Sequence, residues 1–211
     1  MKTVILIPAR QTSTRLPLKH LYPLSPGMNT FDLLEERLGW LNLPTRLFVG
    51  QEDRLYEEIG KPLFDDVIRT NAVKDGDLMG TLWEGSEGFE RVILVYGDSP
   101  LVDSNLVNRL LEWTGTSPFG WADGVKGLRP MVFTRGFLRD WIAQVYAERT
   151  TPFGMLRWPF TFKPLRLKGQ DNWALDTLAD VAAIRELVSA KGISVPYEEV
   201  LKAERSIPCS L

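Results

Sequence analysis

The chain has 211 residues, of which 44% are hydrophobic and 25% are charged, and its formal net charge at pH 7 is -2. This length can bury one sizeable core, so we expect a single domain over residues 1–211. The lysines and arginines are scattered and form no basic block, which excludes nucleic acid as an expected partner.

The first predicted element is a strand over residues 4–8, the apolar run that follows Met1, Lys2 and Thr3. The run ends at Pro8, which is far too short for a signal peptide or a membrane span, so no membrane partner is expected. Cys209 is the only cysteine, which excludes a disulfide framework and a multi-thiolate zinc site. We therefore expect a cytoplasmic protein.

Along the rest of the chain, apolar runs of strand length alternate with segments of helical period. This alternation is typical of an α/β fold with a mainly parallel sheet. The clearest strand covers residues 91–96, because five of its six residues are apolar or aromatic, as in a central strand covered on both faces. Further strands are predicted over residues 47–49, 67–68 and 160–167, and helices over residues 30–41 (capped by Thr30), 52–59, 77–85, 103–111, 137–146 and 177–190.

The loop after the first strand carries three cations within ten residues, Arg10, Arg15 and Lys19. In an open α/β sheet, the loop that leaves the carboxyl end of a strand lies where ligands bind. Arginine grips two phosphate oxygens at once and lysine supplies a compact charge, so this set suits a polyphosphate. The alternative is that the three are ordinary solvated loop cations.

Residues 7–19, Ile-Pro-Ala-Arg-Gln-Thr-Ser-Thr-Arg-Leu-Pro-Leu-Lys, resemble the N-terminal signature of cytidylyltransferases that activate acidic sugars. That family includes CMP-KDO synthetase and the related spore-coat polysaccharide synthesis protein SpsF. Residues 96–103 resemble its Gly-Asp-x-Pro-Leu-Ile-Asp stretch, and residues 175–180 resemble its Val-Asp-Thr-Pro-Glu-Asp stretch. Residues 149–152 match the SpsF-like group more weakly. The resemblance extends over residues 4–190.

The resemblance implies a three-layer nucleotide-diphospho-sugar transferase fold, which is Rossmann-like, with a mainly parallel mixed sheet. It also implies an Mg²⁺-dependent enzyme of nucleotide-sugar and polysaccharide biosynthesis. Such an enzyme joins CMP from CTP, or the nucleotide of another triphosphate, to a sugar or acidic-sugar acceptor and releases pyrophosphate.

The same resemblance assigns roles to particular residues. Asp98 and Asp176 are the implied Mg²⁺ ligands, and the implied catalytic residues are Lys19, Arg15 and Asp98. Mg²⁺ prefers hard oxygen ligands and takes one or two carboxylates, which agrees with two aspartates at two strand ends. The implied nucleotide-binding set is Pro8, Ala9, Arg10, Ser13, Thr14, Arg15, Lys19 and Gly97.

Each aspartate also has a structural interpretation, since Asp98 could open a turn and Asp176 could cap the helix that follows it. Asp103 and Asp180 are expected to be helix-start residues. His20, the only histidine, is expected to be a surface or packing residue outside the site.

Lys126 and Arg129, in a Gly-rich stretch, are candidates for binding an acidic acceptor, with a solvated loop as the alternative. The family motif has Gly where this chain has Leu18. If that position requires a positive φ, we expect the loop to differ here and Lys19 to be displaced. Tyr96 also departs from the motif, at the position before Gly97.

The sequence is also compatible with two other functions. One is a glycosyltransferase of related fold that uses a sugar nucleotide, and the other is a non-catalytic nucleotide-binding member of the family. Trp83, Trp113 and Trp141 occupy helical positions that suit core packing or an oligomer contact, so a homodimer is one partner that the sequence allows.

Overall fold

The computed structural model describes residues 1–70, 77–144, 164–169 and 172–203. Its strands form one sheet in the order β3-β2-β1-β4-β6-β5-β7. β6 is antiparallel to β4 and β5, whereas the other described pairings are parallel, so the predicted mainly parallel mixed sheet is confirmed. The strands are β1 (Thr3–Pro8), β2 (Thr45–Gly50), β3 (Asp66–Thr70), β4 (Arg91–Leu94), β5 (Phe119–Asp123), β6 (Met131–Thr134) and β7 (Leu165–Arg166).

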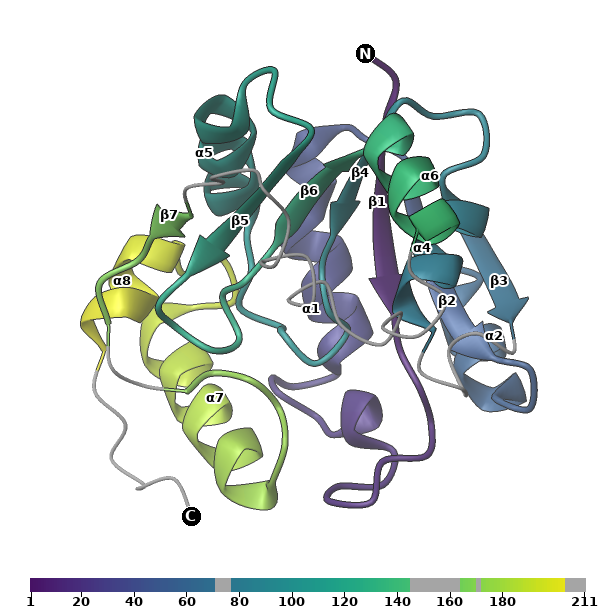
Figure 1. Ribbon diagram of the computed structural model, residues 1–211. Helices are drawn as coiled ribbons and strands as arrows, with labels where there is room; N and C mark the ends of the chain where they lie inside the picture. The colour runs from purple at the N-terminus through teal and green to yellow at the C-terminus, as the bar shows by residue number, and fades with distance from the viewer. Residues whose placement is uncertain (71–76, 145–163, 170–171, 204–211) are drawn as a thin grey trace.

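Helices cover both faces of the sheet and make three layers (Figure 1). Successive side chains of a strand point to opposite faces, so Ile5 and Ile7 of β1 pack into one core cluster and Val4 and Leu6 into the other. The first cluster holds α1 (Thr30–Leu38), α2 (Arg54–Gly60), α5 (Ser104–Thr114), α7 (Leu178–Lys191) and α8 (Tyr197–Lys202). The second holds α4 (Leu78–Gly85) and α6 (Arg135–Gln144).

The parallel register brings the carboxyl ends of three strands to one edge of the sheet. β1 pairs with β2 through Ile7 and Leu47 and with β4 through Leu6 and Leu94. In Figure 1 β1 runs downward, and the loop that leaves it descends to the lower edge, where α7 also lies. Two 3-10 turns, η1 (Lys19–Leu21) and η2 (Gly39–Leu41), complete the connections around α1.

Several predicted boundaries are wrong. Asn29, and not Thr30, caps α1, because its side chain accepts from Phe31 N and Asp32 closes a capping box. β5 and β6 lie in and after the Gly-rich stretch, where short strands between glycines and prolines carry little periodic signal. α8 was not predicted. The central strand ends at Leu94, and residues 145–163, which include part of the last predicted strand and the weak 149–152 match, lie outside the described residues.

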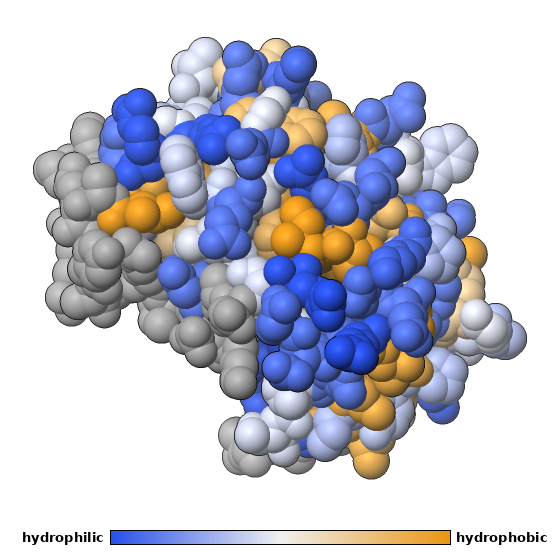
Figure 2. Space-filling model, turned by 90° about the vertical axis from the view of Figure 1, so that its right-hand side faces the viewer, coloured by the Kyte–Doolittle hydropathy of each residue, from blue (hydrophilic) through white to orange (hydrophobic). Residues whose placement is uncertain are grey.

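The outer strand β3 protects its open edge with charge. Asp66 and Arg69 on this strand are exposed, and charged side chains discourage edge-to-edge pairing with another chain. Figure 2 views the molecule from this side and shows a mainly hydrophilic surface on which the apolar patches are separated. None of the described helices is long and apolar enough to span a membrane.

Candidate functional site

The segment of residues 9–20 that follows β1 is here called the basic loop, and its last two residues begin the 3-10 turn η1. Leu18 has φ 53° and ψ 28°, which is the left-handed conformation that favours glycine. The Leu18 amide donates to the Gln11 carbonyl over 3.3 Å and closes the loop on itself. Leu18 thus adopts the positive φ itself, without a glycine. The expectation that Lys19 is displaced from a phosphate stays a prediction.

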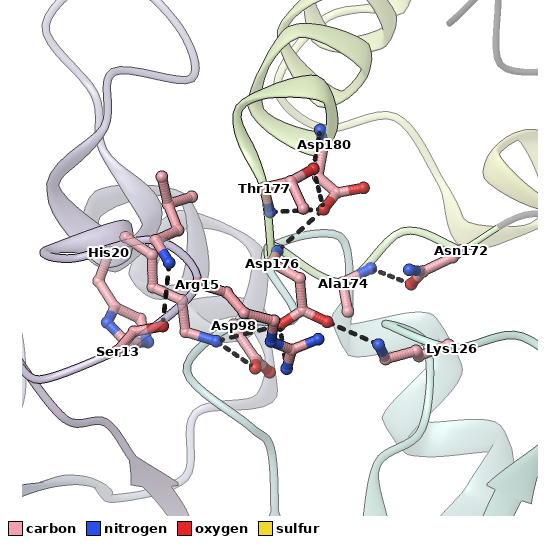
Figure 3. A network of polar contacts seen from close by, with 12 residues as sticks. Ser13, Arg15, His20, Asp98, Lys126, Asn172, Ala174, Asp176, Thr177 and Asp180 are labelled. Carbon is pink, nitrogen blue, oxygen red and sulfur yellow. Dashed lines mark hydrogen bonds and ion pairs between the residues drawn. The ribbon is translucent and has the colours of Figure 1, made fainter. Parts of the chain in front are cut away.

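Lys19 lies between the carboxylates of Asp98 and Asp176, both of which are labelled in Figure 3. Its Nζ is 2.6 Å from Asp98 Oδ2 and 3.6 Å from Asp176 Oδ1. The Lys19 side chain is 9% exposed and that of Asp176 is 6% exposed, whereas 30% of the Asp98 side chain is open to solvent. Two aspartates that are 78 positions apart in the sequence therefore converge on one ammonium group.

Asp176 is surrounded by cations from three segments. Arg15 Nη2 lies 2.9 Å from its Oδ1, and Lys126 Nζ lies 2.6 Å from its Oδ2. Burial would raise the pKa of Asp176, but the hydrogen bond from Lys126 and the charges of Lys19, Lys126 and Arg15 hold the pKa below its ordinary value. Thr177, and not Asp176, caps α7. The capping interpretation of Asp176 is therefore wrong.

Asp98 is placed by the turn that follows β4. Gly97 N donates to Pro8 O over 3.2 Å, and the Asp98 carbonyl accepts from Leu175 N over 2.8 Å. A Cβ on Gly97 would lie 3.0 Å from Pro8 O and 3.0 Å from His20 Nε2, which is tighter than ordinary contact. Gly97 thus allows the segments before Asp98 and Lys19 to approach closely.

The other two aspartates of these segments are helix-start residues, as predicted. Asp103 caps α5 by accepting from Leu106 N, and its second oxygen accepts from Tyr197 N over 2.7 Å. Asp180 accepts from Thr177 N over 2.7 Å in the capping box of α7. The carboxylates of Asp103 and Asp180 therefore both accept hydrogen bonds from backbone amides.

Lys126 reaches Asp176 because its loop packs tightly on the segment before α7. The neighbouring Gly127 has φ 86°, and a Cβ there would lie 2.3 Å from Ala174 N. Trp173 N also donates to the Lys126 carbonyl over 2.8 Å. Arg129 is directed elsewhere, with Nη2 3.9 Å from an Asp123 oxygen and a buried Nε that has no hydrogen-bond partner.

The other residues predicted to bind the nucleotide fall into two groups, those that are exposed and those that bond within the loop or to the sheet. Arg10 and Thr14 are exposed, and within the described part of the chain Arg10 forms no ion pair, so the structure does not bring it into the cluster. Ser13 Oγ accepts from Leu16 N within the loop. Ala9 N donates to Phe48 O over 2.8 Å. Pro8 and Ala9 therefore tie the start of the basic loop to the sheet.

His20 is buried, so of the two expected roles, surface and packing, the structure shows packing. Its ring stacks on Phe31 with centroids 5.3 Å apart, and its Nδ1 is 3.0 Å from the Tyr56 hydroxyl. Burial, together with the charge of Lys19, lowers the pKa of His20 to about 3. The ring is therefore neutral at physiological pH.

Sequence reasoning missed Asp53 and Tyr56, which contact the two ends of the basic loop. Asp53 Oδ2 accepts from Gln11 N, and Tyr56 contacts His20. In the sequence Asp53 has the pattern of an ordinary helix N-cap, and Tyr56 that of an apolar helix position. No local signal distinguishes them.

The donor set fits a divalent cation such as Mg²⁺. Asp98 and Asp176 provide hard carboxylate oxygens that already meet at one positive charge, the Lys19 ammonium. In the described residues no group of three or more His, Cys, Asp or Glu side chains is placed to hold a metal. Two carboxylates leave positions for phosphate and water, which is the usual Mg²⁺ arrangement.

The fold is that of the nucleotide-diphospho-sugar transferases, in agreement with the sequence prediction. No family model matches the chain. Two curated 3-deoxy-manno-octulosonate cytidylyltransferases, from Fusobacterium nucleatum and Trichlorobacter lovleyi, are 27% and 31% identical to it over 116 residues. These matches cover 53% of this chain, and they span 46% and 44% of the two relatives, less than half of their length.

Solved structures of similar fold cover much more of the chain. A cytidylyltransferase from Leptospira borgpetersenii has a TM-score of 0.82 at 21% identity and covers 96% of this chain and 93% of its own. A CMP:2-keto-3-deoxy-manno-octonic acid synthetase complexed with CTP has a TM-score of 0.67 at 16% identity and covers 90% and 99%. The resemblance to cytidylyltransferases that the motifs indicate is confirmed.

Proposed function

We propose that the chain is a nucleotidyltransferase that transfers the cytidylyl group of CTP to a sugar or acidic-sugar acceptor and releases pyrophosphate. The observation that carries the proposal is the convergence of Asp98 and Asp176 on Lys19 at the carboxyl edge of the sheet. The names of the two curated relatives and the CTP complex of the similar synthetase support cytidylyl transfer.

In this proposal the cations of the basic loop bind the triphosphate. Lys19 and Arg15 already reach carboxylate oxygens, so they can exchange these partners for phosphate oxygens. Charge placed beforehand around the leaving pyrophosphate lowers the barrier without a reorganisation cost at the moment of reaction. Arg10 is exposed in the same loop and lies outside the cluster, so in this proposal it would contact the triphosphate only after the triphosphate binds.

Asp98 and Asp176 would hold Mg²⁺, which supplies charge neutralisation at the α-phosphate when bound. In the transfer, an acceptor oxygen forms a bond to the α-phosphorus and the bond from that phosphorus to the bridging oxygen of pyrophosphate breaks. The acceptor hydroxyl proton passes to solvent. His20 takes no part, because its buried ring is bonded to Tyr56, so the chemistry depends on positioning and electrostatics.

The acceptor would bind on the side of Lys126 and Arg129. The side chain of Lys126 is 48% exposed although its Nζ touches Asp176, so it can contact a ligand and a carboxylate at once. Arg129 keeps a buried Nε without a hydrogen-bond partner. Both cations favour an acceptor that carries a carboxylate or a phosphate.

The test is pyrophosphate release, screened over four nucleoside triphosphates and a panel of sugar acids and sugar phosphates, with and without Mg²⁺. We expect release with CTP and one acidic acceptor. Lys19→Ala and Asp98→Ala should abolish it, whereas Lys61→Ala, which removes an exposed cation from an i,i+4 ion pair, should not.

Full activity of both site variants would show that the assigned site is wrong. Absence of release in every well would contradict transfer itself. In that case tight CTP binding that does not depend on Mg²⁺ would indicate a non-catalytic nucleotide-binding protein, and turnover of a sugar nucleotide would indicate a glycosyltransferase.

A further inference from the structure

The start of the basic loop is held by one oxygen of Asp53. Asp53 Oδ2 accepts from Gln11 N over 3.0 Å and from Gly50 N over 3.1 Å. Gly50 is the last residue of β2, so the same oxygen joins the end of a central strand to the loop. The carbonyl of the same residue, Gln11, accepts from Leu18 N. Gln11, which Asp53 fixes at its amide, therefore also closes the loop.

Asp53 makes these contacts instead of capping the helix that follows it. It is the N-cap residue of α2, yet its side chain makes no capping hydrogen bond to that helix. An N-cap aspartate normally accepts from the amides two or three residues ahead of it. Asp53 is 6% exposed, and its carboxylate is directed away from its own helix toward the loop and β2.

The other end of the basic loop is held one helical turn further along α2. Tyr56 is fully buried, and its hydroxyl is 3.0 Å from Nδ1 of His20, the residue after Lys19. The His20 ring also packs edge-to-face against Tyr56 and stacks on Phe31. Because burial keeps His20 neutral, its Nδ1 can accept from the Tyr56 hydroxyl when Nε2 carries the proton.

We propose that Asp53 and Tyr56 are positioning residues, which hold the two ends of the basic loop so that Arg15 and Lys19 face Asp98 and Asp176. Among the described residues no hydrogen bond or ion pair joins α2 to Lys19, Asp98 or Asp176, so α2 acts through the loop. As a statement about catalysis, this inference rests on the proposed function, since the loop is its phosphate-binding element. A loop that is ordered beforehand loses less entropy when the triphosphate binds.

The experiment compares Asp53→Ala and Tyr56→Phe with matched controls in the full chain. Asp65→Ala removes a carboxylate that accepts from Thr45 N over 2.7 Å at the opposite end of β2. Thr114→Val removes a buried hydroxyl that donates to Leu110 O over 2.7 Å, far from the loop in the sequence. The readouts are hydrogen exchange of the loop amides and the kcat and KM for CTP.

We expect the amides of Gln11 and Leu18 to exchange about tenfold faster in Asp53→Ala than in Asp65→Ala, which corresponds to the loss of about one net hydrogen bond. Tyr56→Phe should loosen the loop relative to Thr114→Val. KM for CTP should rise about tenfold with a smaller change in kcat. Simple destabilisation would lower the active fraction and hence kcat, but it would leave KM unchanged. Asp53→Asn should restore KM, because its amide oxygen still accepts from Gln11 N.

Loop exchange equal to that of the controls would overturn the proposal, and so would a loosened loop with an unchanged KM. If the wild-type chain released no pyrophosphate under any condition, the proposed function would fail. The hydrogen-exchange comparison would then still decide whether Asp53 and Tyr56 hold the loop.

Discussion

Two segments of the molecule, residues 97–103 and residues 174–180, each carry a pair of aspartates with different fates. In both, the first aspartate faces side-chain cations and the second accepts from backbone amides. Leu175 N joins the two segments by donating to the Asp98 carbonyl. A carboxylate whose partners are backbone amides stabilises a helix start, whereas one whose partners are side-chain cations can exchange them for a ligand.

The largest expected effect is on activity, when the cation-facing aspartates are neutralised. Asp98→Asn and Asp176→Asn should each lower kcat/KM for CTP by about 10²- to 10³-fold, the size of effect seen when one preorganised electrostatic contact is lost. For Asp98→Asn, whose carboxylate is partly exposed, the free energy of unfolding should change by less than about 1 kcal/mol, because Lys19 keeps Asp176 as its partner. Steady-state kinetics and urea unfolding measure both. A variant that lost stability instead of activity would place its aspartate in the helix-start class.

The next effect is on stability, when a helix-start aspartate is removed. Asp103→Ala takes the cap from α5 and leaves the buried Arg37 guanidinium, 3.7 Å from Asp103 Oδ2, without its carboxylate. The free energy of unfolding should fall by about 3 kcal/mol, with kcat/KM per folded molecule unchanged. Urea unfolding with activity normalised to folded protein checks this. Asp103→Asn, which keeps an acceptor for the cap, should lose less. A loss of activity with unchanged stability would contradict the comparison.

A third prediction concerns pH and the buried ring behind Lys19. Unfolded His20 binds a proton below its ordinary pKa of 6.5, but folded His20 binds one only near pH 3. Between these values the unfolded state holds more protons, so stability falls as pH is lowered, by about 1.4 kcal/mol per pH unit. Wild type should therefore be about 2 kcal/mol less stable at pH 5 than at pH 7.5 from this residue.

His20→Gln isolates that contribution, because glutamine does not titrate. Urea unfolding at the two pH values should give a smaller pH dependence in the variant than in wild type. Equal pH dependence in both proteins would show that His20 is not held neutral, and would remove one support of the loop that carries Lys19.

The smallest effect concerns the strained residue beside Lys19. Leu18→Gly should raise the free energy of unfolding by roughly 0.5–1 kcal/mol, because relief of the left-handed backbone exceeds the added freedom of the unfolded chain. Asn42→Gly is the control, since Asn42 has φ 55° but asparagine tolerates that conformation better. Thermal unfolding measures both, and pyrophosphate release should stay unchanged for Leu18→Gly. A gain no larger than that of Asn42→Gly would show that Leu18 is unstrained.

Much of the fold was predictable because its signals are local. The alternation of apolar runs with helical periods indicated the parallel part of the sheet, and the motifs around Lys19, Asp98 and Asp176 marked three loops that lie at one edge. β5 and β6 were missed because four- and five-residue strands among glycines and prolines have too few positions to show a period.

The sequence was sufficient to select cations and aspartates that the structure brings together, because loops that leave neighbouring parallel strands meet at one edge of the sheet. It left a capping role open for Asp176, because a capping carboxylate and one that faces side-chain cations have similar local sequences, and the structure gives that cap to Thr177. It also could not show that Leu18 adopts a left-handed conformation, or that Asp53 contacts Gln11 and Tyr56 contacts His20. The last two contacts join residues more than 30 positions apart, and the packing of α2, β2 and the basic loop creates them.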